Sequence, residues 1–160
     1  MKNIFFLCYP FSHAGLPAVS VTGWAKGATY NQEGGIPLTL LPANHSWNAV
    51  YVGGNWQLVD CHWATRFDQS ENAVAGAKLT KEYDDFYFLT EPAQMIYSHL
   101  PEDARWQLKE VGWAGGEFEQ HPHVRSHFFS LGLELLSQDY GVLYATKVMR
   151  SSVERLQMCG

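Results

Sequence analysis

Two apolar-rich segments joined by a glycine pair stand out in the first half of the chain. Residues 45 to 52 and 55 to 61 are rich in Val, Trp and Tyr, residue types that suit a pleated, half-buried surface. Gly53-Gly54 separates them, and glycine takes positive φ at both central positions of a type I′ turn without strain. The pattern predicts a two-stranded antiparallel hairpin with a two-residue turn.

The turn length sets which side chains meet. With a two-residue loop Val52 faces Asn55, Trp47 faces Asp60, and His45 is the diagonal neighbour of Asp60 on the same face. Opposed Cβ atoms lie ~5 Å apart and diagonal ones ~7 Å, so an imidazole and a carboxylate can meet there. A three-residue loop would place His45 and Asp60 on opposite faces.

The pattern along the remaining chain predicts further short elements. Residues 18 to 24 alternate as a strand does, and residues 86 to 90 form a second short strand. Thr90-Glu91-Pro92 suits a helix start, and we expect this helix to run to about His99, with His99 as a packed or capping residue. Residues 128 to 148 predict two strands about a Gln-Asp-Tyr-Gly turn. Together the elements predict an α+β fold: a small antiparallel sheet carrying the histidine and aspartate, with helices packed on it.

Composition narrows the class of protein. The chain has 160 residues, of which 46% are hydrophobic, enough for one globular domain with a sizeable core. Its net charge of -5 without a Lys/Arg run argues against nucleic acid as a partner. No stretch approaches the ~20 apolar residues that span a bilayer, so we expect no membrane partner. Three irregularly spaced cysteines indicate neither a disulfide framework nor a zinc ribbon and suit a reducing cytoplasm.

A histidine-rich segment raises the question of a metal site. His121, His123 and His127 could reach one ion if the segment is extended. No nearby cysteine or acid completes the set, and Pro122 indicates an exposed connector. We therefore expect no metal and no organic cofactor.

The predicted His45–Asp60 contact has two interpretations. An aspartate that accepts from one imidazole nitrogen fixes the tautomer and leaves the other nitrogen as a base. This supplies two of the three members of a Cys-His-Asp hydrolase or acyltransferase site. A purely structural cross-strand hydrogen bond explains the same spacing, and the hairpin alone does not separate the two.

Three segments carry a resemblance to a known family. They are AGLPAVSVTGWAKG (14 to 27), HSWNAVYVGGNWQLVDCHW (45 to 63) and DDFYFLTEPAQMIYSHLPEDARWQL (84 to 108). The chain resembles the transglutaminase-like superfamily, in particular its kyphoscoliosis peptidase and hillarin branch, over most of residues 14 to about 135.

The resemblance implies a fold and a site. It implies a transglutaminase-like (papain-like) core over residues 1–125, lacking its N-terminal part, and the beginning of a β-rich C-terminal region over residues 126–160. It gives His45 and Asp60 the catalytic His and Asp roles, and supporting roles to Trp47, Asn48 and Trp63.

The nucleophile is the member that the resemblance does not supply. In the family the catalytic cysteine begins a helix that leads into the segment around Gly15, and counting back places it at or just before Met1. Cys8 lies about two helical turns too late, where the help of a helix N-terminus has faded. We therefore expect Cys8 to pack as a small hydrophobe away from His45, and the chain as written to lack its nucleophile.

Three hypotheses of function remain open. The first is a cysteine peptidase or transglutaminase-like enzyme acting on a protein amide, inactive in the chain as written. The second is a non-enzymatic pseudoenzyme or scaffold that binds cytoskeletal proteins, partners that the resemblance implies. The third is that this chain is a piece of a longer functional unit. All three place the protein in the cytoplasm, with association to the cytoskeleton under the second.

Overall fold

The computed structural model describes residues 11–27, 30, 36–65, 67–68, 80–81, 83–136 and 140–141. Its strands are β1 (Ala18–Ala25), β2 (His45–Val52), β3 (Asn55–Val59), β4 (Phe67–Asp68), β5 (Thr80–Lys81), β6 (Phe88–Thr90) and β7 (His99–Pro101). Its helices are α2 (Cys61–Ala64), α3 (Pro92–Met95), α4 (Gly115–Gln120) and α5 (Ser126–Ser130), with 3-10 turns η1 (Leu38–Leu40), η2 (Asp85–Tyr87) and η3 (Ala104–Gln107). Cys8, and residues 137–139 and 142–148 of the expected C-terminal hairpin, lie outside the described residues.

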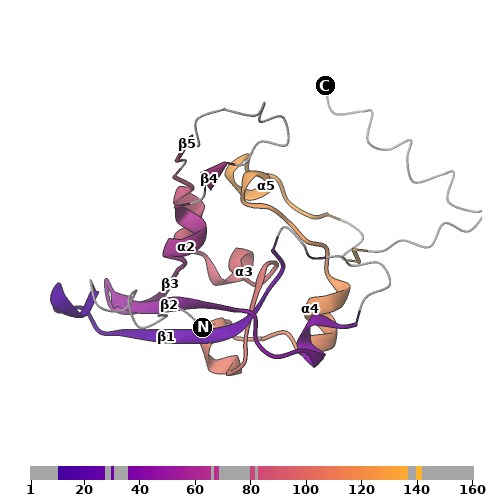
Figure 1. Cartoon of the computed structure of the whole chain (residues 1–160), viewed down its shortest axis with the longest axis horizontal. Coiled ribbons are helices and arrows are strands. Elements are labelled where there is room, and N and C mark those ends of the chain that lie inside the picture. Colours follow the sequence, from indigo (N-terminus) through magenta and orange to yellow (C-terminus); the bar gives the residue numbers. More distant parts are fainter. Residues whose placement is uncertain are drawn as a thin grey trace, which may run out of the picture.

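The main feature is a curved, five-stranded sheet with the order β6-β3-β2-β1-β7. Every neighbouring pair is antiparallel, and β1, β2 and β3 run side by side in the lower part of Figure 1. The short helices lie around this sheet, with α2 and α5 drawn above the strands and α4 near one end. The mixed α+β architecture expected from the sequence is confirmed at this level.

The hairpin that carries the candidate chemistry forms as predicted. Strands β2 and β3 pair from Val52↔Asn55 to Asn48↔Val59. Gly53 and Gly54 have φ of 63° and 86°, the positive values that a type I′ turn requires. One detail differs, because β3 ends at Val59 and Asp60 caps helix α2 and does not pair with Trp47 in the sheet.

The helix expected from Pro92 to about His99 is wrong in its second half. Helix α3 ends at Met95, and residues His99–Pro101 form strand β7 on the edge of β1. A residue that precedes proline disfavours the helical region, which favours extended backbone at Leu100. The backbone groups of β7 are then paired through Ala25↔His99 and Gly23↔Pro101.

The first strand expected from Phe128 is also wrong. Helix α5 occupies Ser126–Ser130, and Gly132 at φ 69° ends it with the left-handed residue typical of a helix C-terminus. The Phe129 ring stacks on Phe86 at 5.5 Å between centroids, a tertiary contact that the local pattern does not contain. The division at 125/126 into core and β-rich region stays a prediction.

Buried side chains form two clusters. The first cluster packs on the sheet between the hairpin and α2, and its members are Val21, Trp47, Ala49, Leu58, Ala64, Tyr87 and Met95. The second cluster lies between β7 and α4, and its members are Ile96, Leu100 and Phe118. Burying an apolar side chain of the larger kind contributes about 1.5–3 kcal/mol. The first cluster includes Trp47 and Tyr87, whose rings lie next to the histidines of the candidate site.

Lys26 links the sheet to α4 from a buried position. Its Nζ donates to the carbonyl oxygens of Phe118 at 2.5 Å and His121 at 2.8 Å, at the C-terminal end of α4. Burial lowers the pKa of Lys26 to about 8, although Glu119 acts in the opposite direction. A cation at the last carbonyls of a helix is favourable, so Lys26 fixes α4 against the end of β1.

Within the part of the chain that the structure describes, no helix is long and apolar enough to cross a membrane.

Candidate active site

Asp60 lies where strand β3 turns into helix α2. Its Oδ1 accepts from the backbone N–H groups of His62 at 2.9 Å and Trp63 at 3.0 Å, as an aspartate at a helix N-cap does. Its own N–H donates to the carbonyl of Tyr87 at 2.9 Å, and the residue is fully buried. One carboxylate oxygen is therefore fixed by backbone, and the other is left for side chains.

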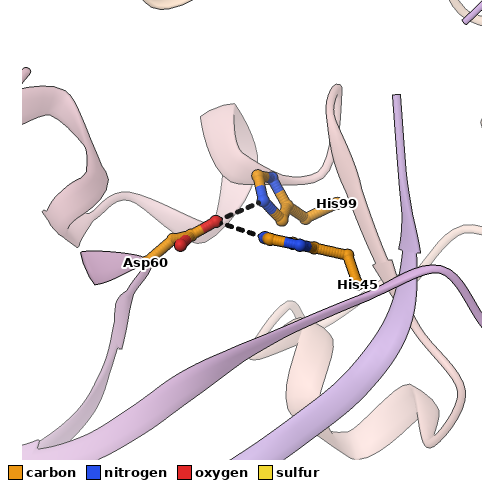
Figure 2. A group of neighbouring side chains, drawn as sticks. All are labelled: His45, Asp60 and His99. Carbon is orange, nitrogen blue, oxygen red and sulfur yellow. Dashed lines mark hydrogen bonds and ion pairs between the residues drawn. The ribbon is translucent and has the colours of Figure 1, made fainter. Parts of the chain in front are cut away.

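His45 is the first residue of β2 and meets that second oxygen. The distance from His45 Nε2 to Asp60 Oδ2 is 2.6 Å, and 15% of the His45 side chain is exposed. Figure 2 shows the imidazole directed at the carboxylate. The expected contact between the histidine and the aspartate is confirmed, and the histidine stays open to solvent on one side.

A second histidine joins the same oxygen from strand β7. His99 Nε2 lies 3.1 Å from Asp60 Oδ2, and His99 Nδ1 lies 2.8 Å from Ser98 Oγ. The side chain of His99 is completely buried. Sequence reasoning expected only a packed or capping residue here. Local spacing carries no signal for a partner 39 positions away, and the one available sign was that His99 stands inside the third family-like segment.

Two tryptophans enclose the histidines. The Trp63 ring lies 5.4 Å from His45 and 4.5 Å from His99 between centroids. Trp47 lies 6.2 Å from His45 and 5.1 Å from His99. Trp47 is 1% exposed, and its Nε1 has no hydrogen-bond partner among the described residues. The two rings thus exclude water from the Asp60 side of the site.

Asn48, the other expected supporting residue, lies on the opposite face of β2, because successive strand residues alternate. It is buried, and its Nδ2 donates to the carbonyl of Val19 on β1 at 3.3 Å. The structure therefore brings Trp47 and Trp63 to His45 and uses Asn48 to tie β2 to β1.

The charge state of the cluster follows from burial and hydrogen bonding. Burial alone raises the pKa of Asp60, but the hydrogen bonds from His45 and His99 outweigh it and hold that pKa well below its usual range. Burial lowers the pKa of His99, and Asp60 opposes this only in part. At neutral pH the site contains a buried carboxylate and a neutral His99.

The cluster also has the composition of a metal site. His45, Asp60 and His99 are the one group of three possible metal ligands in the described residues, with ligand atoms within 4.8 Å of one another. Ligands of a tetrahedral ion with bonds of ~2.0–2.1 Å lie roughly 3.3 Å apart around it. Here both imidazoles contact the same oxygen at direct hydrogen-bond distances, 2.6 and 3.1 Å. The geometry fits a hydrogen-bonded cluster better than a metal cage.

The three histidines considered from the sequence make other contacts. His121 stacks on Trp113 with ring centroids 3.8 Å apart, and His123 meets the edge of Tyr30 at 5.9 Å. His127 is exposed on α5. Within the described ranges these side chains form no group of metal ligands.

Among the described residues the one cysteine is Cys61, which follows Asp60 at the start of α2. Burial and the neighbouring carboxylate raise the pKa of its thiol. Since the thiolate is the nucleophilic form, Cys61 is not activated. The expected separation of Cys8 from His45 falls outside the described residues and stays a prediction.

Comparison with curated proteins finds relatives over most of the chain. The chain is 37% identical to hillarin of Drosophila melanogaster over 155 residues, 92% of this chain and 18% of hillarin. It is 36% identical over 130 residues to Lim and transglutaminase domain protein ltd-1 of Caenorhabditis elegans, covering 78% of this chain and 18% of that protein. It is 34% identical over 120 residues to kyphoscoliosis peptidase of Mus musculus, covering 75% of this chain and 17% of that protein.

These similarities place the chain in the transglutaminase-like family that includes hillarin and kyphoscoliosis peptidase. No family model matches the sequence. The chain spans less than a fifth of the length of the curated relatives it matches.

Proposed function

We propose that His45 and Asp60 are the base and the orienting carboxylate of a Cys-His-Asp site for acyl transfer at protein amides. The observation that carries the proposal is the 2.6 Å bond from His45 Nε2 to a buried, ionised Asp60. A buried carboxylate at Nε2 fixes the proton there and leaves Nδ1 as the base. A merely structural pair has no need of an imidazole that stays partly open to solvent.

The chemistry that this arrangement supports has two halves. His45 Nδ1 takes the thiol proton of a cysteine, and the sulfur attacks the carbonyl carbon of a peptide or glutamine amide. The tetrahedral intermediate expels the amine, which takes the proton from Nδ1 and leaves a thioester. Water or a primary amine then attacks the thioester, with Nδ1 again accepting the proton, and the thiol is restored. The first acceptor gives peptidase activity and the second transamidase activity.

The thiol must come from outside the described residues. Cys61 is not activated, and we expect Cys8 to pack as a small hydrophobe. Loss of the nucleophile from a catalytic triad reduces kcat by about 10⁶. We therefore expect the chain as given to show no turnover.

The test compares this chain with a version extended upstream to supply a cysteine at the start of the helix that leads to Gly15. Fluorescent casein reports peptidase turnover, and a fluorescent primary amine reports transamidation. We expect turnover only in the extended chain, its loss in a His45→Ala variant, and its retention in His127→Ala, an exposed histidine on α5. Turnover by the chain as given that disappears in Cys8→Ala would show that Cys8 is the nucleophile. An extended chain that folds but stays inert would refute the proposal.

A non-enzymatic role is the second candidate, favoured by the absence of an activated thiol among the described residues. In this role the domain is a cytoskeletal binding module in the cytoplasm, and His45, Asp60 and His99 serve stability. Co-sedimentation of the chain with purified actin filaments and with microtubules tests it. Saturable binding that is unchanged in His45→Ala supports the scaffold role, and no binding to either filament argues against it.

A further inference from the structure

The Asp60 carboxylate is shared by two histidines (Figure 2). The His45 side chain is 15% exposed, whereas the His99 side chain is completely buried. We propose that His99 is a positioning residue: it donates Nε2–H to Asp60 and thereby holds Oδ2 as the acceptor that keeps His45 in the Nε2–H tautomer. The inference deepens the proposed function, since the tautomer of His45 matters for catalysis only if Nδ1 serves as the base.

The direction of each hydrogen bond follows from counting donors. An ionised carboxylate only accepts, and Oδ1 already accepts from two backbone N–H groups. Both imidazoles meet Oδ2 through Nε2, so both Nε2 atoms must carry protons. Asp60 thus receives four hydrogen bonds.

Ser98 fixes the far side of the His99 ring. With Nε2 protonated, a neutral His99 has Nδ1 free as an acceptor. Ser98 Oγ lies 2.8 Å from this Nδ1, so a neutral His99 that carries its proton on Nε2 accepts from the Ser98 hydroxyl. The hydroxyl proton then no longer serves the longer, 3.3 Å contact with the Met95 carbonyl. The result is a directed chain from Ser98 through His99 to Asp60, with every proton assigned.

Neutrality of His99 is what makes the arrangement useful. A protonated His99 would compensate the Asp60 charge and weaken its hold on His45, whereas a neutral donor orients the carboxylate and leaves its charge in place. Complete burial against Trp47, Trp63 and Tyr87 keeps the ring uncharged, and burial lowers its pKa accordingly. Among the described residues, the titratable groups that face it are Asp60, His45 and Tyr87, and His123 interacts with it electrostatically.

An alternative is that His99 only fills space between the aromatic rings. Two substitutions separate the roles. His99→Leu fills the space with an apolar side chain and removes the hydrogen-bond donor. His99→Gln supplies an N–H₂ donor that can reach Asp60 from the position of Nε2. Ile96→Ala is the packing control, because Ile96 is buried in the cluster with Phe118 of α4 and its side chain offers no hydrogen-bond donor to Asp60.

The primary readout is the tautomer of each histidine in the chain as given, measured from ring ¹⁵N shifts and long-range ¹H–¹⁵N couplings. We expect Nε2–H at both His45 and His99. We expect His99→Leu to convert His45 to a mixture of tautomers, with His99→Gln and Ile96→Ala retaining the single form. His99 protonated on Nδ1, or a His45 tautomer unchanged in His99→Leu, would overturn the inference. If His99→Leu does not fold, the tautomers of the unsubstituted chain and of His99→Gln still decide.

A second readout uses the extended, cysteine-containing chain. Residues that orient metal ligands through hydrogen bonds typically contribute 10–100-fold in activity. By analogy we expect His99→Leu to lower kcat about 10–100-fold with KM unchanged, and His99→Gln to restore most of it. A fall in kcat of the same size in His99→Gln and His99→Leu, or an effect confined to KM, contradicts the positioning role. Because the tautomer measurement needs no turnover, an inactive extended chain would refute the proposed function without deciding the role of His99.

Discussion

Asp60 connects local structure to chemistry at the scale of single residues. The same carboxylate caps α2 through Oδ1 and receives both imidazoles through Oδ2. Its cap role needs only an oxygen, which asparagine also supplies. Its role toward the histidines needs a second acceptor, which asparagine replaces with an N–H₂ donor.

This difference predicts the effect of Asp60→Asn. We expect helix α2 to keep its cap, and His45 to move its proton to Nδ1 so that Nε2 accepts from the amide. The new amide N–H₂ at position 60 then faces the Nε2–H of His99, so two buried donors meet without an acceptor. We expect this to lower the free energy of unfolding by about 2 kcal/mol. Urea unfolding measures the loss and ring ¹⁵N shifts measure the tautomer. A His45 that keeps Nε2–H in this variant contradicts the assigned hydrogen-bond directions.

Two glycines control the site at the scale of elements. Gly54 turns the β2–β3 hairpin and Gly23 lets β7 approach β1. They act for different reasons, because Gly54 needs a positive φ of 86° in open space, whereas Gly23 needs the absence of a side chain.

Gly54→Val tests the turn. A β-branched residue resists positive φ, and the strain costs of order 1–3 kcal/mol, so we expect lower stability and disturbed signals from His45. Gly54→Asn is the control, because asparagine visits the left-handed region more readily and no atom lies within 4 Å of the new Cβ. Equal losses in both variants would show that conformation is not the cause.

Gly23→Ala tests the approach of β7. A Cβ on Gly23 would lie 2.1 Å from the Leu100 carbonyl oxygen and 2.8 Å from Trp47 Cη2, so β7 must move and carry His99 away from Asp60. Overpacking of this kind costs typically 1–3 kcal/mol, and we expect about 3 kcal/mol in chemical unfolding. Gly116→Ala, in α4 with no atom within 4 Å, is expected to be neutral or slightly stabilising. An unaffected Gly23→Ala protein contradicts the described β1–β7 packing.

The buried cluster couples the stability of the whole molecule to pH. His99 has a lowered pKa, so the unfolded chain binds a proton near the ordinary value of 6.5 that the folded chain excludes. Stability from this group is present above pH 6.5 and is lost as the pH falls toward the folded pKa. Asp60 also has a lowered pKa, so its contribution is present above 3.8 and is lost as the pH falls further.

We therefore predict two successive losses of stability on acidification. Each fully exchanged proton changes the free energy of unfolding by about 1.4 kcal/mol per pH unit. Urea unfolding between pH 8 and pH 3 measures the first phase and the onset of the second, and His99→Gln should reduce the first. Part of the first loss of stability should remain in His99→Gln, because burial also lowers the pKa of His123. Stability that is constant from pH 7 to pH 5 contradicts a neutral, buried His99.

The sequence predicted the features that depend on neighbouring residues. The glycine pair predicted the turn, the turn predicted the register, and the register predicted the His45–Asp60 contact. The errors fall where distant segments meet. Strand β7 forms because β1 offers an unpaired edge, and α5 packs its Phe129 on Phe86. Neither partner is visible in a local pattern.

By itself the sequence determined the hairpin, the α+β class and the first pair of the site, because turn geometry and side-chain alternation act over a few residues. Only the tertiary structure decided that Asp60 leaves the strand to cap a helix and that its second oxygen is shared. The pairing of β7 with β1 brings His99 to Asp60 across 39 positions. The burial that keeps His99 neutral and Asp60 ionised is likewise a property of the assembled core, since it depends on rings from β2, α2 and η2 that meet only in the folded chain.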